Sequence, residues 1–232
     1  MGLGMRVYLA SPNNQQQAEH VAGMPVLLSY ALWAPWLDKS YQQSFSHLLI
    51  DSGAFSEFNS GKKVDLAAYV DWAQRWIGHA DAIAGLDDIS GDWRQSLRNY
   101  EAFPLGFPTF HESDPPEFLN DLVALAQERK QWLGIGLIPP RNGKEKWVRR
   151  VLDQIPEGLH VHGWACRYYT HVRRFDSVDS TNWWRDAMDL RKLTELSHLT
   201  YGECLEIVVK RYVRWRRSVQ DVRSETVFFK NL

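Results

Sequence analysis

Short apolar segments alternate with longer segments of helical spacing along most of the chain. Eight apolar segments are predicted to be strands: residues 7–10, 26–29, 48–50, 82–86, 107–110, 133–137, 159–162 and 174–178. Parallel strands need a crossover connection, usually a helix, so this alternation predicts an α/β fold with a parallel sheet. Eight such units predict a compact (β/α)8 barrel of the TIM type. An open doubly wound sheet is the alternative, although the first strand-to-helix turn has no G-x-G-x-x-G motif.

Helices are predicted where apolar residues recur at spacings of three and four after a residue that can cap a helix. The first begins at Ser11-Pro12 and ends near Gly23, and the next three follow Asp65 (66–77), Asp92 (93–102) and Asp114-Pro115 (116–130). Of the last three predicted helices, the first begins after Gly143 and runs to residue 155, the second covers about 183–196 and the third about 202–219.

The composition fits a single globular domain spanning residues 1–232. Lys and Arg number 27 and Asp and Glu 28, so the net charge is -1 and any nucleic-acid site must be a local patch. No apolar run approaches the roughly 20 residues that a membrane helix needs, and residues 1–10 lack a signal-peptide pattern. Cys166 and Cys204 are too few for a disulfide framework or a four-cysteine zinc site. We therefore expect a cytoplasmic protein without a membrane partner, of undetermined oligomeric state.

Polar side chains follow several of the predicted strands. The strand-end residues are Asp51, Asp87, His111, His162 and Asp179. Each could serve structure alone, as a helix cap, a solvated turn or a rim histidine. In a barrel, however, the carboxyl ends of the strands form one mouth, where chemistry takes place. The sixth strand instead carries Gly134 and Gly136, where a backbone could approach a ligand closely.

Carboxylates gathered at one mouth suit two chemistries. They can bind a divalent metal, or they can divide the roles of nucleophile and acid/base at a glycosidic bond. The sequence has no H-E-x-x-H motif and no His-x-His pair near the first strand, although His160 and His162 form a possible ligand pair on a late strand. Glycosidic chemistry is therefore favoured over a metal-dependent hydrolase.

Four segments resemble the signature segments of tRNA-guanine transglycosylases, in the family's order. The segment 51–55 (DSGAF) resembles the family's Asp-Ser-Gly-Gly-Phe/Tyr, and the segment 80–88 resembles a strand that ends in Phe-Asp-Glu. The segment 134–137 is similar to Gly-Gly-Leu, and the segment 175–181 to Phe-Asp-Ser/Cys. The resemblance implies a (β/α)8 barrel that exchanges guanine for a 7-deazaguanine. The exchange proceeds by double displacement at the sugar C1′, through an aspartyl-glycosyl intermediate, with no cofactor and no catalytic metal.

The resemblance also implies roles for individual residues. Asp51 matches the general acid/base, Phe55 the ring that stacks on the base, Asp87 the carboxylate that reads the base edge, and Gly134 and Gly136 the backbone that contacts the base. His111 falls where the family has a base-reading glutamine, and His162 is included in the expected base pocket. The nucleophile is Asp179 or Asp176. We prefer Asp179, because it lies at the strand end, and expect Asp176 to be a structural residue buried near Arg173 or Arg174.

Two departures from the tRNA enzymes bear on the substrate. The family's zinc site is absent, because only Cys204 follows residue 180, and the tRNA enzymes are much longer. The chain more closely resembles the minimal phage and bacterial transglycosylases that insert 7-deazaguanine into DNA. We therefore expect a pentosyltransferase acting on DNA rather than tRNA. The alternatives are a metal-dependent barrel hydrolase and a nucleic-acid-binding barrel without exchange activity.

The last predicted helix carries a basic and aromatic stretch, KRYVRWRR, over residues 210–217. Such a stretch can bind a phosphate backbone, or it can simply be a solvated helix face. Two further basic clusters follow the sixth and seventh strands. The residues expected to contact nucleic acid are Arg141, Lys144, Arg167, Lys210, Arg214 and Arg217.

Overall fold

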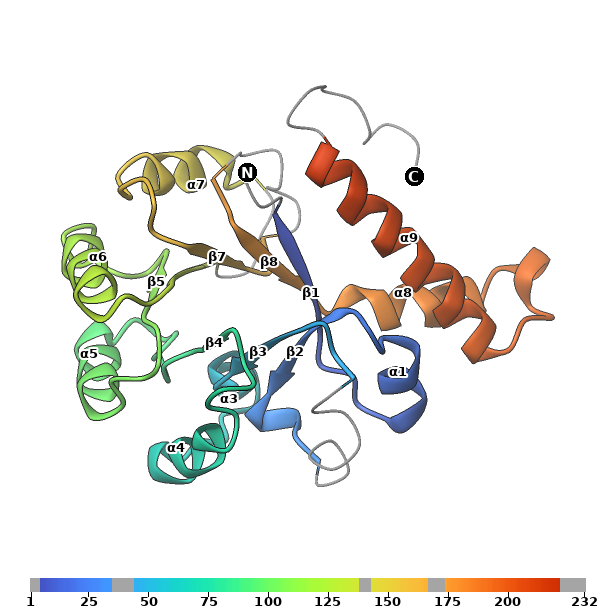
Figure 1. The fold of residues 1–232 in the computed structure, drawn as a ribbon, viewed down its shortest axis with the longest axis horizontal. Helices are drawn as coiled ribbons and strands as arrows, with labels where there is room; N and C mark the ends of the chain where they lie inside the picture. Colours follow the sequence, from blue (N-terminus) through green and yellow to red (C-terminus); the bar gives the residue numbers. More distant parts are fainter. Residues whose placement is uncertain (1–4, 35–43, 138–142, 167–173, 222–232) are drawn as a thin grey trace.

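A computed structural model describes residues 5–34, 44–137, 143–166 and 174–221, with the side chains of 215–221 left out. Eight strands form one sheet in the order β4-β3-β2-β1-β8-β7-β6-β5, and every neighbouring pair is parallel. The strands are β1 (Arg6–Ala10), β2 (Pro25–Ser29), β3 (His47–Asp51), β4 (Ala82–Ile83), β5 (Thr109–His111), β6 (Leu133–Gly136), β7 (Val161–Trp164) and β8 (Ser177–Ser180). The sheet curls, and helices surround its outer face (Figure 1). The predicted α/β class with a parallel sheet is confirmed.

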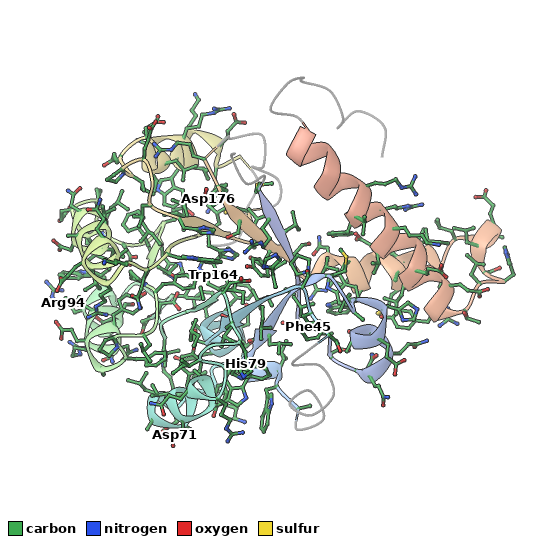
Figure 2. All side chains as sticks on the ribbon, viewed as in Figure 1. Phe45, Asp71, His79, Arg94, Trp164 and Asp176 are labelled. Atoms are coloured by element: carbon green, nitrogen blue, oxygen red, sulfur yellow. The ribbon has the colours of Figure 1, made fainter. Side chains whose placement is uncertain are left out.

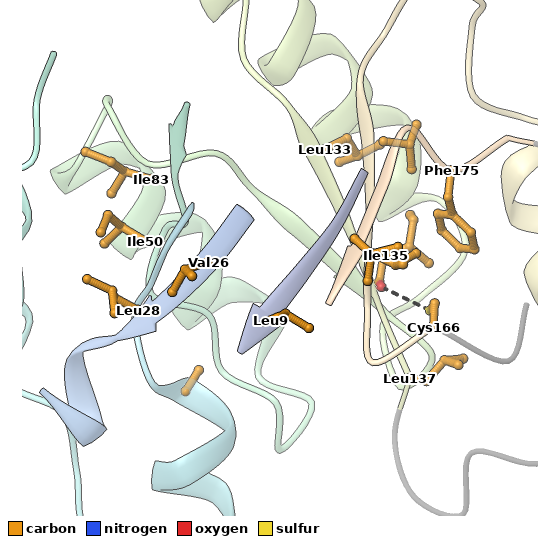
Figure 3. Packing of buried hydrophobic residues seen from close by; sticks show 14 of the residues in the cluster. Leu9, Val26, Leu28, Ile50, Ile83, Leu133, Ile135, Leu137, Cys166 and Phe175 are labelled. Atoms are coloured by element: carbon orange, nitrogen blue, oxygen red, sulfur yellow. Dashed lines mark hydrogen bonds between the residues drawn. The ribbon is translucent and has the colours of Figure 1, made fainter. Parts of the chain in front are cut away.

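The strands read as continuous apolar runs because both faces of the sheet are buried. Val7 and Leu9 belong to the large core between sheet and helices, whereas Tyr8 and Ala10 belong to a smaller inner cluster with Leu27, Leu49, Ala84 and Phe107. Alternate residues therefore point outward and inward, as the pleat requires. Figure 3 shows part of the larger core, in which the Sγ of Cys166 lies 3.9 Å from the Ile135 carbonyl oxygen.

The helices are α1 (Gln15–His20), α3 (Ala54–Ser60), α4 (Leu66–Gln74), α5 (Trp93–Ala102), α6 (Phe118–Arg129), α7 (Glu145–Leu152), α8 (Asn182–Leu190) and α9 (Tyr201–Asp221), with short 3-10 turns η1 (Tyr30–Leu32) and η3 (Thr194–Leu196). The predicted caps at Asp65 and Asp92 are confirmed, because their carboxylates accept the backbone N–H of Ala68 at 2.8 Å and of Gln95 at 3.1 Å. In Figure 1, α4 to α7 lie on one side of the curled sheet, and α1, α8 and α9 lie together on the other.

Several predicted boundaries are wrong. The first helix begins at Gln15 rather than near Pro12, because the Asn14 side chain caps it by accepting the Gln17 N–H at 2.9 Å. Helix α3 follows β3 directly and was not predicted, since its seven residues are mostly polar or exposed. Strand β4 is shorter than expected, β5 and β7 begin two residues later, and β8 begins three residues later. Asp179 therefore lies within β8 instead of after it.

The outermost strands of the sheet approach each other at one point. Ala84, just after β4, forms a parallel bridge with Phe107, just before β5. Two backbone hydrogen bonds support the bridge, from the Gly85 N–H to Phe107 O at 2.9 Å and from the Phe107 N–H to Ile83 O at 2.8 Å. A Cβ on Gly106 would collide with the Gly85 backbone, so the missing side chain allows this close approach. None of the described helices is sufficiently long and apolar to cross a membrane.

Candidate active site

The inward face of the sheet carries the predicted polar residues at its carboxyl edge. Asp51 ends β3 two residues after the inward Leu49, and His111 ends β5 two residues after Thr109. Asp179 has the same parity on β8, because its neighbour Val178 belongs to the outer core. The alternation of strand side chains thus brings residues from three separate strands to one interior. This interior is the candidate active site.

Asp51 is a partly buried carboxyl at the start of a sharp turn. Burial raises its pKa to about 6, and the Asp87 and Asp179 carboxylates contribute in the same direction, whereas the Ser29 hydroxyl and the Gly53 amide act against them. Gly53 has a φ of 86° and caps α3, and a Cβ there would collide with Ala31. Glycine is therefore required in the turn that ends β3 on Asp51 and starts the next helix. A carboxyl with a pKa near neutrality is suited to proton transfer.

The turn after the neighbouring strand β7 holds the Asp179 side chain in place. This side chain is buried, and its Oδ1 accepts the Ala165 backbone N–H at 2.7 Å. Ala165 has a φ of 54°, a left-handed conformation that is uncommon outside glycine. The turn after β7 therefore adopts a costly conformation in which an amide points at this carboxylate. Nothing in the sequence marks Ala165, because every residue except proline carries a backbone N–H.

Asp87 is already engaged by a histidine. Nε2 of His111 forms a close ion pair with Oδ2 of Asp87, and both side chains are almost completely buried. Burial alone would lower the pKa of His111, but the Asp87 charge and hydrogen bond outweigh it, and the pKa is raised. The His111 backbone N–H donates to Asp114 Oδ2 at 2.7 Å, and burial raises the pKa of the Asp114 carboxyl. One oxygen of the predicted base-reading carboxylate is thus held by a residue that was itself predicted to read the base.

Gly134 and Gly136 are required for a different reason than expected. A Cβ on Gly134 would collide with the Thr109 and Trp164 side chains, and a Cβ on Gly136 would collide with the His111 ring. Trp164 Nε1 donates to Thr109 Oγ1 at 3.0 Å, across the strand that carries these glycines. Side chains from β5 and β7 therefore cover β6. In this structure the glycines make room for protein side chains.

Two further predicted residues lie away from the position expected for them. His162 has no exposed surface, so it is not placed for contact with a bound base. Asp176 precedes β8 at the amino edge, where its carboxylate accepts the Val161 N–H at 2.8 Å. It is exposed, so the expected burial is wrong; Arg173 lies outside the described residues. Figure 2 labels Trp164 near the middle of the molecule and Asp176 above it in this view.

Exposed aromatic side chains follow Asp51 on α3. Phe55, the predicted stacking residue, is 38% exposed. Phe58, three residues later and therefore on the same helix face, is 44% exposed and was not predicted. Its signal in the sequence is this helical spacing from Phe55, which becomes readable only once α3 is recognised.

Three of the six residues predicted to contact nucleic acid have side chains that the structure describes. Lys144 forms an ion pair with Glu112, and Lys210 with Glu206 at 2.6 Å, whereas Arg214 is exposed on α9. The Tyr212 hydroxyl lies 3.1 Å from Ser180 Oγ, which places this part of α9 beside the carboxyl end of β8. Arg141 and Arg167 lie outside the described residues, as does the side chain of Arg217.

Comparison with known protein-family models found no match, and a search of curated proteins also found none. Among the described residues, no group of three or more His, Cys, Asp or Glu side chains is arranged to hold a metal ion.

Proposed function

We propose that the chain is a base-exchange glycosyltransferase that replaces guanine in a nucleic acid, with DNA favoured over tRNA, by a 7-deazaguanine-type base. One observation carries the proposal: two inward carboxyl groups have different surroundings. Asp51 has a pKa raised to about 6, while Asp179 is held by a backbone amide beside a buried histidine. Two carboxyl groups in such different surroundings can divide the roles of proton donor and nucleophile. The resemblance of segment 51–55 to the transglycosylase signature supports the same division of roles.

The reaction has two displacements. The Asp179 carboxylate attacks C1′ of the nucleotide, the bond from C1′ to guanine breaks, and Asp51 gives its proton to the departing base. The incoming base then attacks C1′ and loses its ring N–H proton to the Asp51 carboxylate. The ester bond to Asp179 breaks, and both residues return to their starting states. Neither step consumes a cofactor.

The base is proposed to bind between the Phe55 ring and the Asp87–His111 pair. The ion pair holds the Asp87 carboxylate in a fixed orientation, which favours selective recognition of a guanine edge. The covering of Gly134 and Gly136 by side chains leaves less backbone for the base to contact than the resemblance implies.

We also propose that the sheet closes into a complete (β/α)8 barrel. The bridge between Ala84 and Phe107 supports closure, and Tyr69 braces it by donating its hydroxyl hydrogen to the Ala84 carbonyl at 2.5 Å. A closed barrel would direct the inward side chains of all strands to one mouth.

An exchange assay tests the function. The protein is incubated with labelled guanine or a labelled 7-deazaguanine base and either DNA or tRNA, and the polymer is isolated and counted. We expect label in DNA. Label in tRNA would change the assigned substrate from DNA to tRNA. Binding of polymer without incorporation of label would show that the chain is a nucleic-acid-binding barrel without exchange activity.

Replacement of Asp87 with alanine is expected to weaken base binding and to lower the discrimination in favour of guanine by about 1–3 kcal/mol, because the base loses a hydrogen-bond acceptor. Titration calorimetry with guanine measures the affinity, and thermal unfolding checks that the fold persists. Asp88→Ala is the matched control, since Asp88 is the adjacent residue and its Oδ1 accepts the Ser90 N–H at 2.8 Å. Unchanged affinity in the Asp87 variant would remove Asp87 from the base pocket.

The double replacement Arg214→Glu with Arg217→Glu is expected to weaken polymer binding and flatten its salt dependence. Each lost phosphate contact lowers the slope of log K against log salt by about 0.9 for duplex DNA or 0.7 for a single strand. Arg191→Glu with Lys192→Glu carries the same change of charge on exposed residues after α8. Equal slopes in the two variants would assign the α9 cations to a solvated helix face.

A further inference from the structure

A row of polar side chains, half-buried at His160 and buried at Ser177 and His162, leads to Asp179 from the amino end of β7. His160 Nε2 lies 3.0 Å from Ser177 Oγ, and His162 Nδ1 lies 2.9 Å from the same oxygen. The other ring nitrogen of His162, Nε2, lies 3.7 Å from Asp179 Oδ1 and has no hydrogen-bond partner among the described residues. His162 and Ser177 are both fully buried and lie opposite each other in the β7–β8 register. The backbone therefore holds the row in place.

Proton counting leaves two arrangements for the neutral row. The Ser177 hydroxyl has one hydrogen, so it donates to one histidine and accepts from the other. In the first arrangement it donates to His162 Nδ1, and the His162 hydrogen is then on Nε2, facing Asp179. In the second it donates to His160, and His162 then presents a bare Nε2 lone pair to the carboxylate. Burial lowers the pKa of His160 to about 4, so this ring is neutral near pH 7 in either case.

Electrostatics distinguishes the two arrangements. A lone pair facing a carboxylate is repulsive in a buried site, whereas an N–H facing it is attractive. His162 cannot turn away, because rings from several elements pack around it: Trp164 at 4.4 Å, Tyr8 at 6.1 Å, Trp132 at 6.4 Å and Phe107 at 6.5 Å between centroids. Tyr8 donates its hydroxyl hydrogen to Asp81 at 2.9 Å, and the same Asp81 oxygen accepts the Leu48 N–H at 3.0 Å near the start of β3. Asp179 is then the one carboxylate that His162 faces among the described residues.

We propose that His162 is a positioning residue for Asp179, with its Nε2–H directed at Oδ1 and its tautomer set by Ser177 and His160. Both the Ala165 amide and His162 then engage Oδ1. Oδ2 of Asp179 makes no hydrogen bond to the described residues and is the oxygen that attacks C1′. The choice of attacking oxygen rests on the proposed function, whereas the position of the His162 hydrogen does not.

Nitrogen-15 NMR of histidine-labelled protein tests the position of the hydrogen directly, without substrate. We expect His160 and His162 both to carry hydrogen on Nε2, with assignments from His160→Gln and His162→Gln. A His162 ring that carries hydrogen on Nε2, neutral or cationic, supports the proposal. A His162 ring with bare Nε2 overturns it, whatever the activity.

Two substitutions test the consequence for chemistry. Glutamine places an amide near the position of Nε2, whereas asparagine reaches only the position of Nδ1. We expect His162→Asn to slow single-turnover formation of the covalent adduct about 100-fold through misplacement of the carboxylate, with polymer affinity unchanged. His162→Gln should recover most of the rate. Equal losses in both variants would overturn positioning, and an absence of adduct in the parent protein would overturn the proposed function while leaving the NMR result to stand.

Discussion

Replacement of Asp179 with asparagine is expected to abolish the covalent adduct between protein and nucleic acid. The substitution keeps the size of the side chain and an oxygen that can accept the Ala165 amide hydrogen, but an amide is a poor nucleophile at C1′. The parent protein is incubated with substrate under single-turnover conditions, and the adduct is detected by denaturing gel and by intact mass. Loss of adduct with retained polymer binding is the expected result.

Asp176→Asn provides the matched control three residues away. Asp176 is exposed at the amino edge and accepts the Val161 N–H, so its replacement should alter stability more than chemistry. If the Asp176 variant loses the adduct and the Asp179 variant keeps it, the two assignments are reversed. If the parent protein never traps a nucleic acid, double displacement fails for this chain.

The protonation state of Asp51 is expected to set the pH dependence of the rate of the first displacement. With a pKa of about 6, the group is protonated below that pH and ionised above it. Departure of guanine needs the Asp51 proton. The single-turnover rate of guanine release should therefore fall about tenfold for each pH unit above 6. Asp51→Asn should be slow at every pH and should lose this dependence. A rate independent of pH between 5 and 8 in the parent protein would remove Asp51 from the role of acid.

The same carboxyl is expected to cost stability at neutral pH. Its pKa is about 6 in the fold and about 3.9 in an unfolded chain, so the folded state binds the proton more tightly. The fold therefore loses stability as the pH rises from about 4 to 6, by roughly 3 kcal/mol at most. Asp51→Asn should raise the free energy of unfolding by up to this amount at pH 8 and by little at pH 4. Urea titrations at the two pH values measure the difference, and equal effects at both would contradict the linkage.

The choice between strand and helix could be predicted from sequence because the interactions that decide it are local. A side-chain cap such as Asp92 accepts a hydrogen bond from a residue three positions later, and alternation in a strand spans only a few residues. Element boundaries were less predictable where a second nearby residue could also cap the helix. Asn14 displaced the predicted cap at Ser11, whose φ of 54° is not helical, and the polar residues of α3 concealed a helix.

The sequence by itself determined the α/β alternation and the placement of Asp51 and His111 at strand ends, since both depend on order along the chain. Asp87 lies beyond the end of β4, which is shorter than predicted. Only the tertiary structure decided which of these groups meet. The Asp87–His111 pair, the Ala165 amide on Asp179 and the row of His160, Ser177 and His162 each join residues from different strands or turns. Strand register and the packing of neighbouring side chains set those contacts. The raised pKa of Asp51 likewise requires burial, which exists only once the sheet has curled around it.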